Sequence, residues 1–240
     1  PISYSTDNGV TGRNNAGTVV ADTPLGQSIN LDTPGIIIKP LDMHQLLINQ
    51  QAQCVDNDGR VHVLALHRRQ DPGYEYPQIT PAPFSTLATA YSHYFRDPTT
   101  GVWSQRRLPA DAYPVGSRPK IAYDTQGNVY AVYLSYAAGT AVTPGYANGK
   151  LVIASASKAS EYTDWEVVQA LDVDLNGEPL MDQARLLADN ILSVYIQENS
   201  AVTTVVGTPL HVFDFVVGVK PPQSLSLNFS GPDSLVVLKA

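Results

Sequence analysis

The chain has 240 residues, which is enough for one large all-β domain or for part of one. Hydrophobic residues make up 43% of it, so a packed core is expected and disorder is not the default. The formal net charge of −7 weakly disfavours nucleic acid and acidic membranes as partners, and no apolar run reaches the roughly 18 residues of a membrane span. A local basic cluster could still bind an anionic substrate.

The N-terminal part of the chain predicts loops with few strands. Residues 1–22 are polar and rich in Gly and Asn, a composition typical of a loop with one outer strand. Two strand-like runs follow, Gly35–Lys39 and His44–Ile48, which we expect to complete one unit and lead into the next. The chain starts at Pro1, without an initiator Met and in mid-unit, so we expect a further N-terminal part to be missing.

Residues 49–108 predict a four-stranded antiparallel meander. Asp58-Gly59 lies between two alternating apolar runs, which is a strong signal for a β-hairpin. A long loop rich in Pro and Tyr follows, then a third strand that ends at a turn over Asp97–Gly101. Trp103 opens the fourth strand. Four such strands form one blade of a β-propeller.

The same unit recurs with a period of roughly 65 residues, against about 40–50 for the common propeller repeats. Residues 117–171 form the second copy, in which Asp124 aligns with Asp56, and residues 178–217 form the third. Strands in the third copy are expected near Ala184–Ala188, Leu192–Gln197 and Leu210–Val216, with two further candidates at Ser226–Asn228 and Leu235–Leu238.

These repeats predict an all-β fold, a β-propeller of four-stranded antiparallel blades with partial blades at both ends. A closed propeller takes roughly four to eight blades, so this chain is either a small propeller or part of a larger ring. The single cysteine, Cys54, lies inside a strand pattern and is expected to be a buried small hydrophobe. Asn228-Phe229-Ser230 is an acceptor pattern for N-glycosylation, which favours a secreted, extracellular protein.

Three runs carry a family resemblance: NQQAQCVDNDGRVHVLALHRR, YSHYFRDPTTGVWSQRRLP and GSRPKIAYDTQGNVYAVY. They resemble the BNR-repeat-containing polysaccharide lyases, which include ulvan lyases and lyases that cut rhamnosyl-glucuronate linkages. The resemblance covers roughly residues 14–165 and implies that the chain is the C-terminal portion of a seven-bladed propeller. A separate N-terminal fragment or a second copy of the chain would then complete the ring.

The resemblance implies β-elimination on a uronate. A base removes the proton at C5, a cation stabilises the developing carboxylate dianion, and an acid protonates the oxygen that leaves C4. No cofactor is implied. Some relatives hold a structural zinc with two Cys and two His, a set that Cys54 alone cannot reproduce, so no metal site is assigned.

Candidate site residues follow from blade geometry, because the start of the first strand, the end of the second strand and the loop after it share one rim. Arg suits a carboxylate through its planar fork, and Tyr beside a cation can act as base, acid or both. The candidates for catalysis are His67, Arg68, Tyr74, Tyr76 and Arg118, and those for substrate binding are Gln50, Arg69, Lys120, Gln183 and Arg185.

Plainer roles stay open for several of these residues. Arg68 and Arg69 could be solvated loop charges, and Lys120 could pair with a neighbouring acid. His62 and His93 should lie away from the rim as packed, hydrogen-bonded residues of the blade. Two other functions also stay open: a sialidase-like glycoside hydrolase and a non-catalytic glycan-binding propeller. Release of an unsaturated product would separate a lyase from both.

Overall fold

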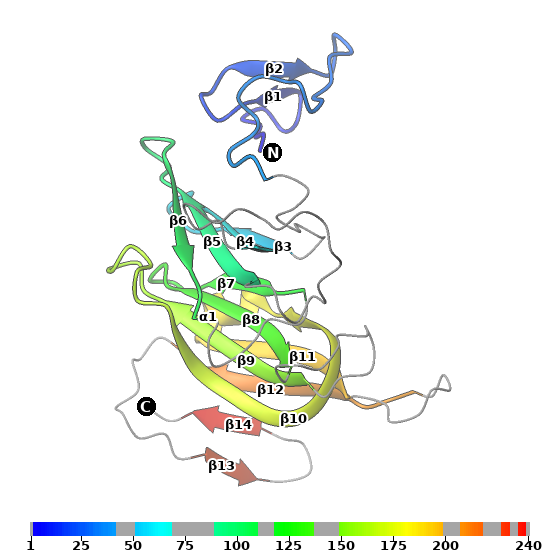
Figure 1. Ribbon diagram of the computed structural model, residues 1–240, viewed down its shortest axis with the longest axis vertical. Coiled ribbons are helices and arrows are strands. Elements are labelled where there is room, and N and C mark those ends of the chain that lie inside the picture. Colours follow the sequence, from blue (N-terminus) through cyan, green and yellow to red (C-terminus); the bar gives the residue numbers. More distant parts are fainter. Residues whose placement is uncertain are drawn as a thin grey trace, which may run out of the picture.

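The computed structural model describes residues 2–41, 51–68, 89–109, 118–136, 149–198, 207–217, 227–230 and 235–238. In these ranges the chain is almost wholly β, with fourteen strands and one seven-residue helix (Figure 1). All strand pairs are antiparallel. The prediction of an all-β chain built on antiparallel sheets is therefore confirmed for the described residues. None of their helices is long and apolar enough to traverse a lipid bilayer.

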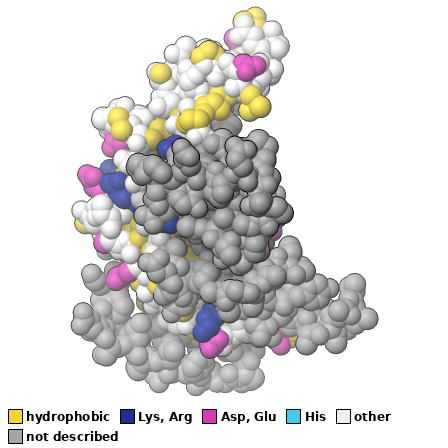
Figure 2. Space-filling view, in the orientation of Figure 1, with side chains coloured by type: hydrophobic (Ala, Val, Ile, Leu, Met, Phe, Trp, Pro, Cys, Tyr) yellow, Lys and Arg dark blue, Asp and Glu magenta, His cyan; other side chains and the backbone are white. Residues whose placement is uncertain are grey.

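An N-terminal unit, residues 2–41, lies at one end of the molecule (Figure 1). It contains two strands, β1 (Thr11–Arg13) and β2 (Val19–Asp22), where one outer strand was expected. The predicted strand at Gly35–Lys39 is wrong, because this segment has no strand pairing. The predicted run His44–Ile48 lies outside the described residues. Apolar side chains are scattered over the surface of this end of the molecule (Figure 2).

Asn15 joins the N-terminal unit to the first large sheet. Its side-chain oxygen accepts hydrogen bonds from Trp103 Nε1 at 2.9 Å and from Arg96 Nε at 2.8 Å. Its side-chain nitrogen donates to the backbone oxygen of Gly101 at 3.0 Å. One small amide therefore satisfies two donors and one acceptor of the Asp97–Gly101 turn region.

The first large sheet has four strands in sequential order: β3 (Gln51–Val55), β4 (Val61–Arg68), β5 (Thr89–Arg96) and β6 (Trp103–Arg107). It matches the meander predicted over residues 49–108. The β3–β4 turn forms because Asp56 Oδ1 accepts from the backbone N–H groups of Asp58 and Arg60. Gly59 supplies the left-handed residue that this turn needs, with φ of +82°.

The second large sheet has six strands, in the order β12-β11-β10-β9-β8-β7. Its strands are β7 (Lys120–Tyr123), β8 (Val129–Tyr136), β9 (Gly149–Ala156), β10 (Glu166–Met181), β11 (Ile191–Glu198) and β12 (Leu210–Val216). The second and third predicted units are thus joined in one sheet.

The long strand β10 makes this join. Its first part pairs with β9, from Glu166 to Leu175, and its last part pairs with β11, from Leu175 to Met181. The register shifts between Asn176 and Leu180. Two residues explain this irregularity, since Gly177 has φ of +88° and Pro179 lacks a backbone N–H.

Helix α1 (Gln183–Asp189) replaces the strand predicted at Ala184–Ala188, so that prediction is wrong. The alternating pattern of this segment resembled a strand, but its Ala, Leu and Arg residues are also good helix formers. Asp182 caps the helix by accepting from Arg185 N at 3.0 Å, and Asn190 ends it in the left-handed conformation.

The two large sheets pack against each other through their leading strands. Strand β3 contacts β7, and α1 contacts β7 from its other side. A shared core fills the space between the sheets, with Leu64 and Tyr91 from the first sheet and Tyr133 and Val152 from the second. Strands β13 (Leu227–Ser230) and β14 (Leu235–Leu238) form a separate hairpin, and β14 lies against β12.

Candidate functional site

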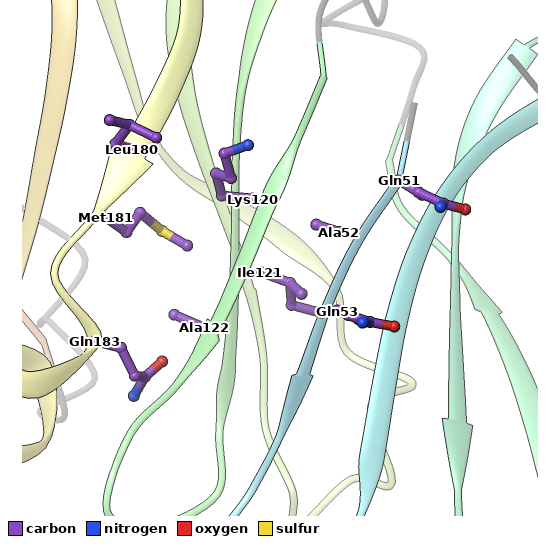
Figure 3. Close-up of a pocket in the computed structure, with 9 residues that line it drawn as sticks. All are labelled: Gln51, Ala52, Gln53, Lys120, Ile121, Ala122, Leu180, Met181 and Gln183. Atoms are coloured by element: carbon purple, nitrogen blue, oxygen red, sulfur yellow. The ribbon is translucent and has the colours of Figure 1, made fainter. Parts of the chain in front are cut away.

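A groove of about 340 Å³ opens where the leading segments of three successive units meet (Figure 3). One wall is β3, another is β7, and the third is the end of β10 with the start of α1. Its lining residues are Gln51, Ala52, Gln53, Lys120, Ile121, Ala122, Leu180, Met181 and Gln183. The groove therefore combines an apolar floor with one ammonium group, that of Lys120, and the side-chain amide of Gln183.

The side chains of the groove alternate along β3, as strand geometry requires. Gln51 and Gln53 are exposed, whereas Ala52 is partly buried. Figure 3 shows the Ala52 methyl group on the side that faces β7, with the two glutamine amides on the other side of the strand. The two glutamines therefore border the groove through the strand itself, and their amides are turned away from β7.

A carboxylate bridges the two predicted cations beside the groove. Arg118 Nη1 bonds to Glu178 Oε1, and Lys120 Nζ lies 3.8 Å from Glu178 Oε2. Lys120 therefore pairs with a neighbouring acid, which is one of the two roles that the sequence left open for it. Elsewhere too, basic and acidic side chains lie next to one another on the face seen in Figure 2.

Gln183 and Arg185 have structural partners. The side chain of Gln183 donates to Tyr123 O at 2.8 Å and accepts from Tyr123 N at 3.3 Å, so it continues the hydrogen bonding of the β7 edge. Arg185 Nη1 bonds to Ser193 Oγ and to Asp214 Oδ1, both at 2.8 Å. Gln183 still lines the groove, whereas Arg185 is not part of its lining.

His67 is buried, with 4% of its surface exposed. Its Nε2 lies 2.7 Å from Tyr94 Oη, so the imidazole shares a short hydrogen bond with a phenol inside the sheet. The backbone of Arg68 ends β4. Its side chain lies outside the described residues, as do the predicted site residues Gln50, Arg69, Tyr74 and Tyr76. Of the ten predicted residues, the structure gathers Lys120 and Gln183 at the groove and Arg118 beside it.

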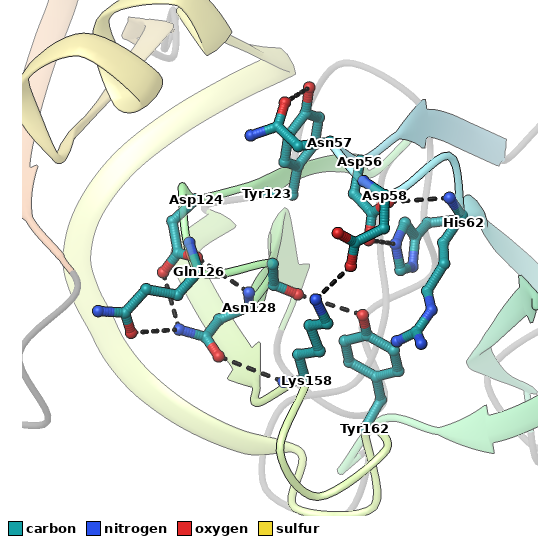
Figure 4. A network of polar contacts seen from close by, with 12 residues as sticks. Asp56, Asn57, Asp58, His62, Tyr123, Asp124, Gln126, Asn128, Lys158 and Tyr162 are labelled. Atoms are coloured by element: carbon teal, nitrogen blue, oxygen red, sulfur yellow. Dashed lines mark hydrogen bonds and ion pairs between the residues drawn. The ribbon is translucent and has the colours of Figure 1, made fainter. Parts of the chain in front are cut away.

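A buried chain of titratable groups crosses the first sheet near its β3–β4 turn. His62 and His93 are both fully buried, as predicted. His62 Nε2 lies 3.4 Å from Asp56 Oδ2, and its Nδ1 lies 3.0 Å from His93 Nε2 (Figure 4 shows the Asp56 and His62 end). If His62 donates to Asp56, His93 must donate to His62, which leaves His93 Nδ1 as a bare acceptor without a partner.

Burial governs the protonation of this pair. It lowers the pKa of His62, against the opposing effect of the Asp56 carboxylate. The pKa of His93 lies well below its usual value because of burial, with smaller effects from His62 and Arg106. Both rings are therefore neutral at pH 7. The rings stack at 5.2 Å, and Tyr162 meets each of them edge-on.

The two large sheets are tied together at their turns. Lys158 bonds to Asp58 across the sheets, and the ring of Tyr162 packs edge-on against His62 and His93 of the first sheet. Tyr162 Oη donates to Gly127 O at 3.2 Å, which joins two turns of the second sheet (Figure 4). The repeat is also visible here. Tyr130 Oη donates to Asp124 at a distance of 3.0 Å, and Tyr130 occupies in the second sheet the position that His62 occupies beside Asp56 in the first. The equivalence of His62 and Tyr130 can be found in the sequence by aligning Asp56 with Asp124.

The described part of the chain offers few groups that could bind a metal ion. It contains no group of three or more His, Cys, Asp or Glu side chains arranged to hold a metal ion. Burial raises the pKa of Cys54 to about 12, with a smaller contribution from Asp56. The sulfur is therefore a neutral thiol at pH 7 and a poor metal ligand in that form.

The chain is similar to a protein family and to solved structures. The family model described as BNR repeat-containing family member matches residues 3–111, which include β1 to β6. The crystal structure of polysaccharide lyase Uly1 is similar with a TM-score of 0.49 and 13% sequence identity, over 88% of this chain and 38% of that chain. This chain thus spans less than half the length of that structure. No curated protein matches. The family match supports a relation to BNR-repeat proteins in the first part of the chain.

Proposed function

We propose that this chain is part of a β-propeller polysaccharide lyase that cleaves a uronate-containing, rhamnose-rich glycan by β-elimination. The observation that carries the proposal is the groove of about 340 Å³, with Lys120 in its lining and Arg118 beside it. Two cations in one place on a protein of net charge −7 favour a local anionic ligand. The match to a BNR-repeat family supports a propeller of this kind.

The groove residues suit the recognition of an acidic sugar. Arg118 can bind a carboxylate through two parallel hydrogen bonds, and Lys120 adds a point charge. In β-elimination a base takes the C5 proton, the electron pair forms the C4–C5 double bond, and the C4–O bond breaks. A cation held at the carboxylate stabilises the charge that develops before the bond breaks. We assign this electrostatic role to Arg118 and Lys120. We assign the roles of base and acid to Tyr74 or Tyr76.

The arrangement of strands supports the place of this groove in a ring. The innermost strands of successive blades face the central channel of a propeller. Here β3, β7 and the end of β10 begin three successive units and together line the groove. We propose that an N-terminal fragment or a second copy of the chain completes the ring, and that the protein is secreted and needs no cofactor.

The test has a binding arm and a product arm. Calorimetry should show binding of a rhamnose- and glucuronate-containing polysaccharide and none of a neutral glucan. Lys120→Met should weaken binding at least several-fold, whereas Lys150→Met, which removes an exposed lysine paired with Asp172, should not. Ultraviolet absorbance should then reveal an unsaturated uronate. Fragments without unsaturation would favour a hydrolase. Binding without products by the completed ring would favour a glycan-binding module, and absence of binding would refute a glycan function.

A further inference from the structure

We infer that Glu178 is a built-in competitor for the substrate's carboxylate. Its own carboxylate takes the place between Arg118 and Lys120 in which a uronate carboxylate would bind, so a glycan must displace it. This inference rests on the proposed function and extends it. It assigns a role in specificity to a residue that contributes to none of the predicted chemistry.

The geometry of the three side chains is that of an occupied carboxylate site. One oxygen of Glu178 bonds to Arg118, and the other lies 3.8 Å from Lys120. A planar carboxylate held by two separate cations through its two oxygens is how a uronate would be bound. Two cations and one anion leave one net positive charge, which still attracts an anionic chain towards the groove.

The backbone at Glu178 differs from that of the strand around it. The residue lies between Asn176 and Leu180, where the register of β10 against β11 shifts. Gly177 before it adopts φ of +88°, and Pro179 after it cannot donate a backbone hydrogen bond. Glu178 has no partner in the ladders that β10 forms with β9 and β11, so a movement of this residue breaks no ladder pair.

The two ion pairs of Glu178, with Arg118 and with Lys120, are solvent-exposed and therefore weak. The side chains of Arg118, Lys120 and Glu178 are 45%, 29% and 42% exposed. Exposed ion pairs contribute little to stability, because water screens the charges and two long side chains lose freedom. A multivalent glycan can therefore replace Glu178 at a small cost in affinity, while a single small anion competes poorly with a carboxylate tethered to the same site.

A positioning role for Glu178 predicts the opposite sign of effect. If Glu178 orients Arg118 for the substrate, its removal weakens binding. If it competes, removal of its charge tightens binding of an acidic glycan. The chain offers a matched control in Asp172, which lies on the same strand, is exposed, and pairs with Lys150 at 3.3 Å. Glu178→Gln and Asp172→Asn change the net charge equally.

The experiment is calorimetric titration of the whole chain with a polyglucuronate and with a neutral glucan. We expect Glu178→Gln to bind polyglucuronate roughly 5- to 10-fold more tightly than wild type, and Asp172→Asn to differ by less than about 2-fold. Adding Lys120→Met to Glu178→Gln should abolish the gain. Glu178→Ala serves as a second variant that removes the charge, and a thermal melt verifies that each variant is folded.

The outcomes separate the inference from the proposed function. Equal or weaker binding of polyglucuronate by both Glu178 variants overturns the competitor role and leaves the glycan function standing. An equal gain in the Asp172→Asn control also overturns it, because the effect would then come from net charge alone. Absence of binding by wild type and every variant overturns the proposed function and the inference together.

Discussion

Replacing His93 by Ile should make the protein less sensitive to acid. The second large sheet supplies the model for this change, because Ile153 holds in β9 the place that His93 holds in β5, by the register of each strand with its neighbour. Ile153 is 1% exposed and His93 is fully buried. The first sheet therefore carries a titratable ring where the second carries an alkyl group.

The sign of the effect follows from linkage. The pKa of His93 is lowered in the folded state relative to the usual 6.5, so below pH 6.5 the unfolded chain binds a proton that the folded chain does not. Above pH 6.5 this group does not affect the free energy of unfolding. Below pH 6.5 the free energy of unfolding decreases as the pH is lowered. One such histidine costs about 1.4 kcal/mol per pH unit, or about 2 kcal/mol between pH 6.5 and pH 5.

The measurement is urea unfolding at several pH values between 5 and 8, followed by tryptophan fluorescence. Trp165 is a suitable reporter because its ring lies 5.4 Å from that of His93. We compare slopes with pH, because the substitution also removes the hydrogen bond to His62 and shifts stability at every pH. His93→Ile should lose about 2 kcal/mol less than wild type over this interval.

The control replaces a histidine that is not buried. His211 is partly exposed and pairs with Glu198 at 2.9 Å, so His211→Gln should leave the acid-dependent loss of stability caused by His93 in place. An unchanged pH dependence in His93→Ile would refute the reasoning, since it would mean that His93 is protonated equally in the folded and unfolded states.

Three further predictions concern stability and reactivity. Asn15→Ala should destabilise the contact between the N-terminal unit and the first sheet by about 1–3 kcal/mol, because it leaves Trp103 Nε1 without its acceptor, and hydrogen exchange in residues 2–41 should rise. Asp182→Ala should lower the free energy of unfolding by about 1 kcal/mol through loss of the helix cap, as read from urea denaturation. Cys54 should react with a disulfide reagent at pH 8 roughly a thousandfold more slowly than free cysteine, and reaction at the ordinary rate would contradict its raised pKa.

The first large sheet could be predicted from the sequence because its signals are local. The turn at Asp56–Arg60 is fixed by Asp56 and by Gly59, three residues later, and the alternation of β4 begins directly after the turn. Helix α1 could not be predicted, since the alternation of Ala184, Leu186 and Ala188 is that of a strand. In the helix Leu186 is buried, whereas Ala184 and Ala188 are exposed. Its cap at Asp182 decides in favour of the helix.

The candidate site was predictable in part. Lys120 could be placed at the groove by aligning the repeats on their turn aspartates, which sets the start of β7. Glu178 was missed because it meets Arg118 across 60 residues of chain, from a segment of β10 without regular pairing. Long-range ion pairs leave no periodic signal in a sequence.

The long strand β10 means that the boundary between two repeats lies within a strand and not in a loop. Chain termini and inserted domains are best tolerated at exposed loop tips. A cut between Leu171 and Leu180 would instead divide a strand whose first part pairs with β9 and whose last part pairs with β11, with Leu175 paired to both. The repeats of this chain are therefore not interchangeable parts: a unit exchanged, duplicated or deleted here would have to carry β10 whole, together with a partner strand on each side.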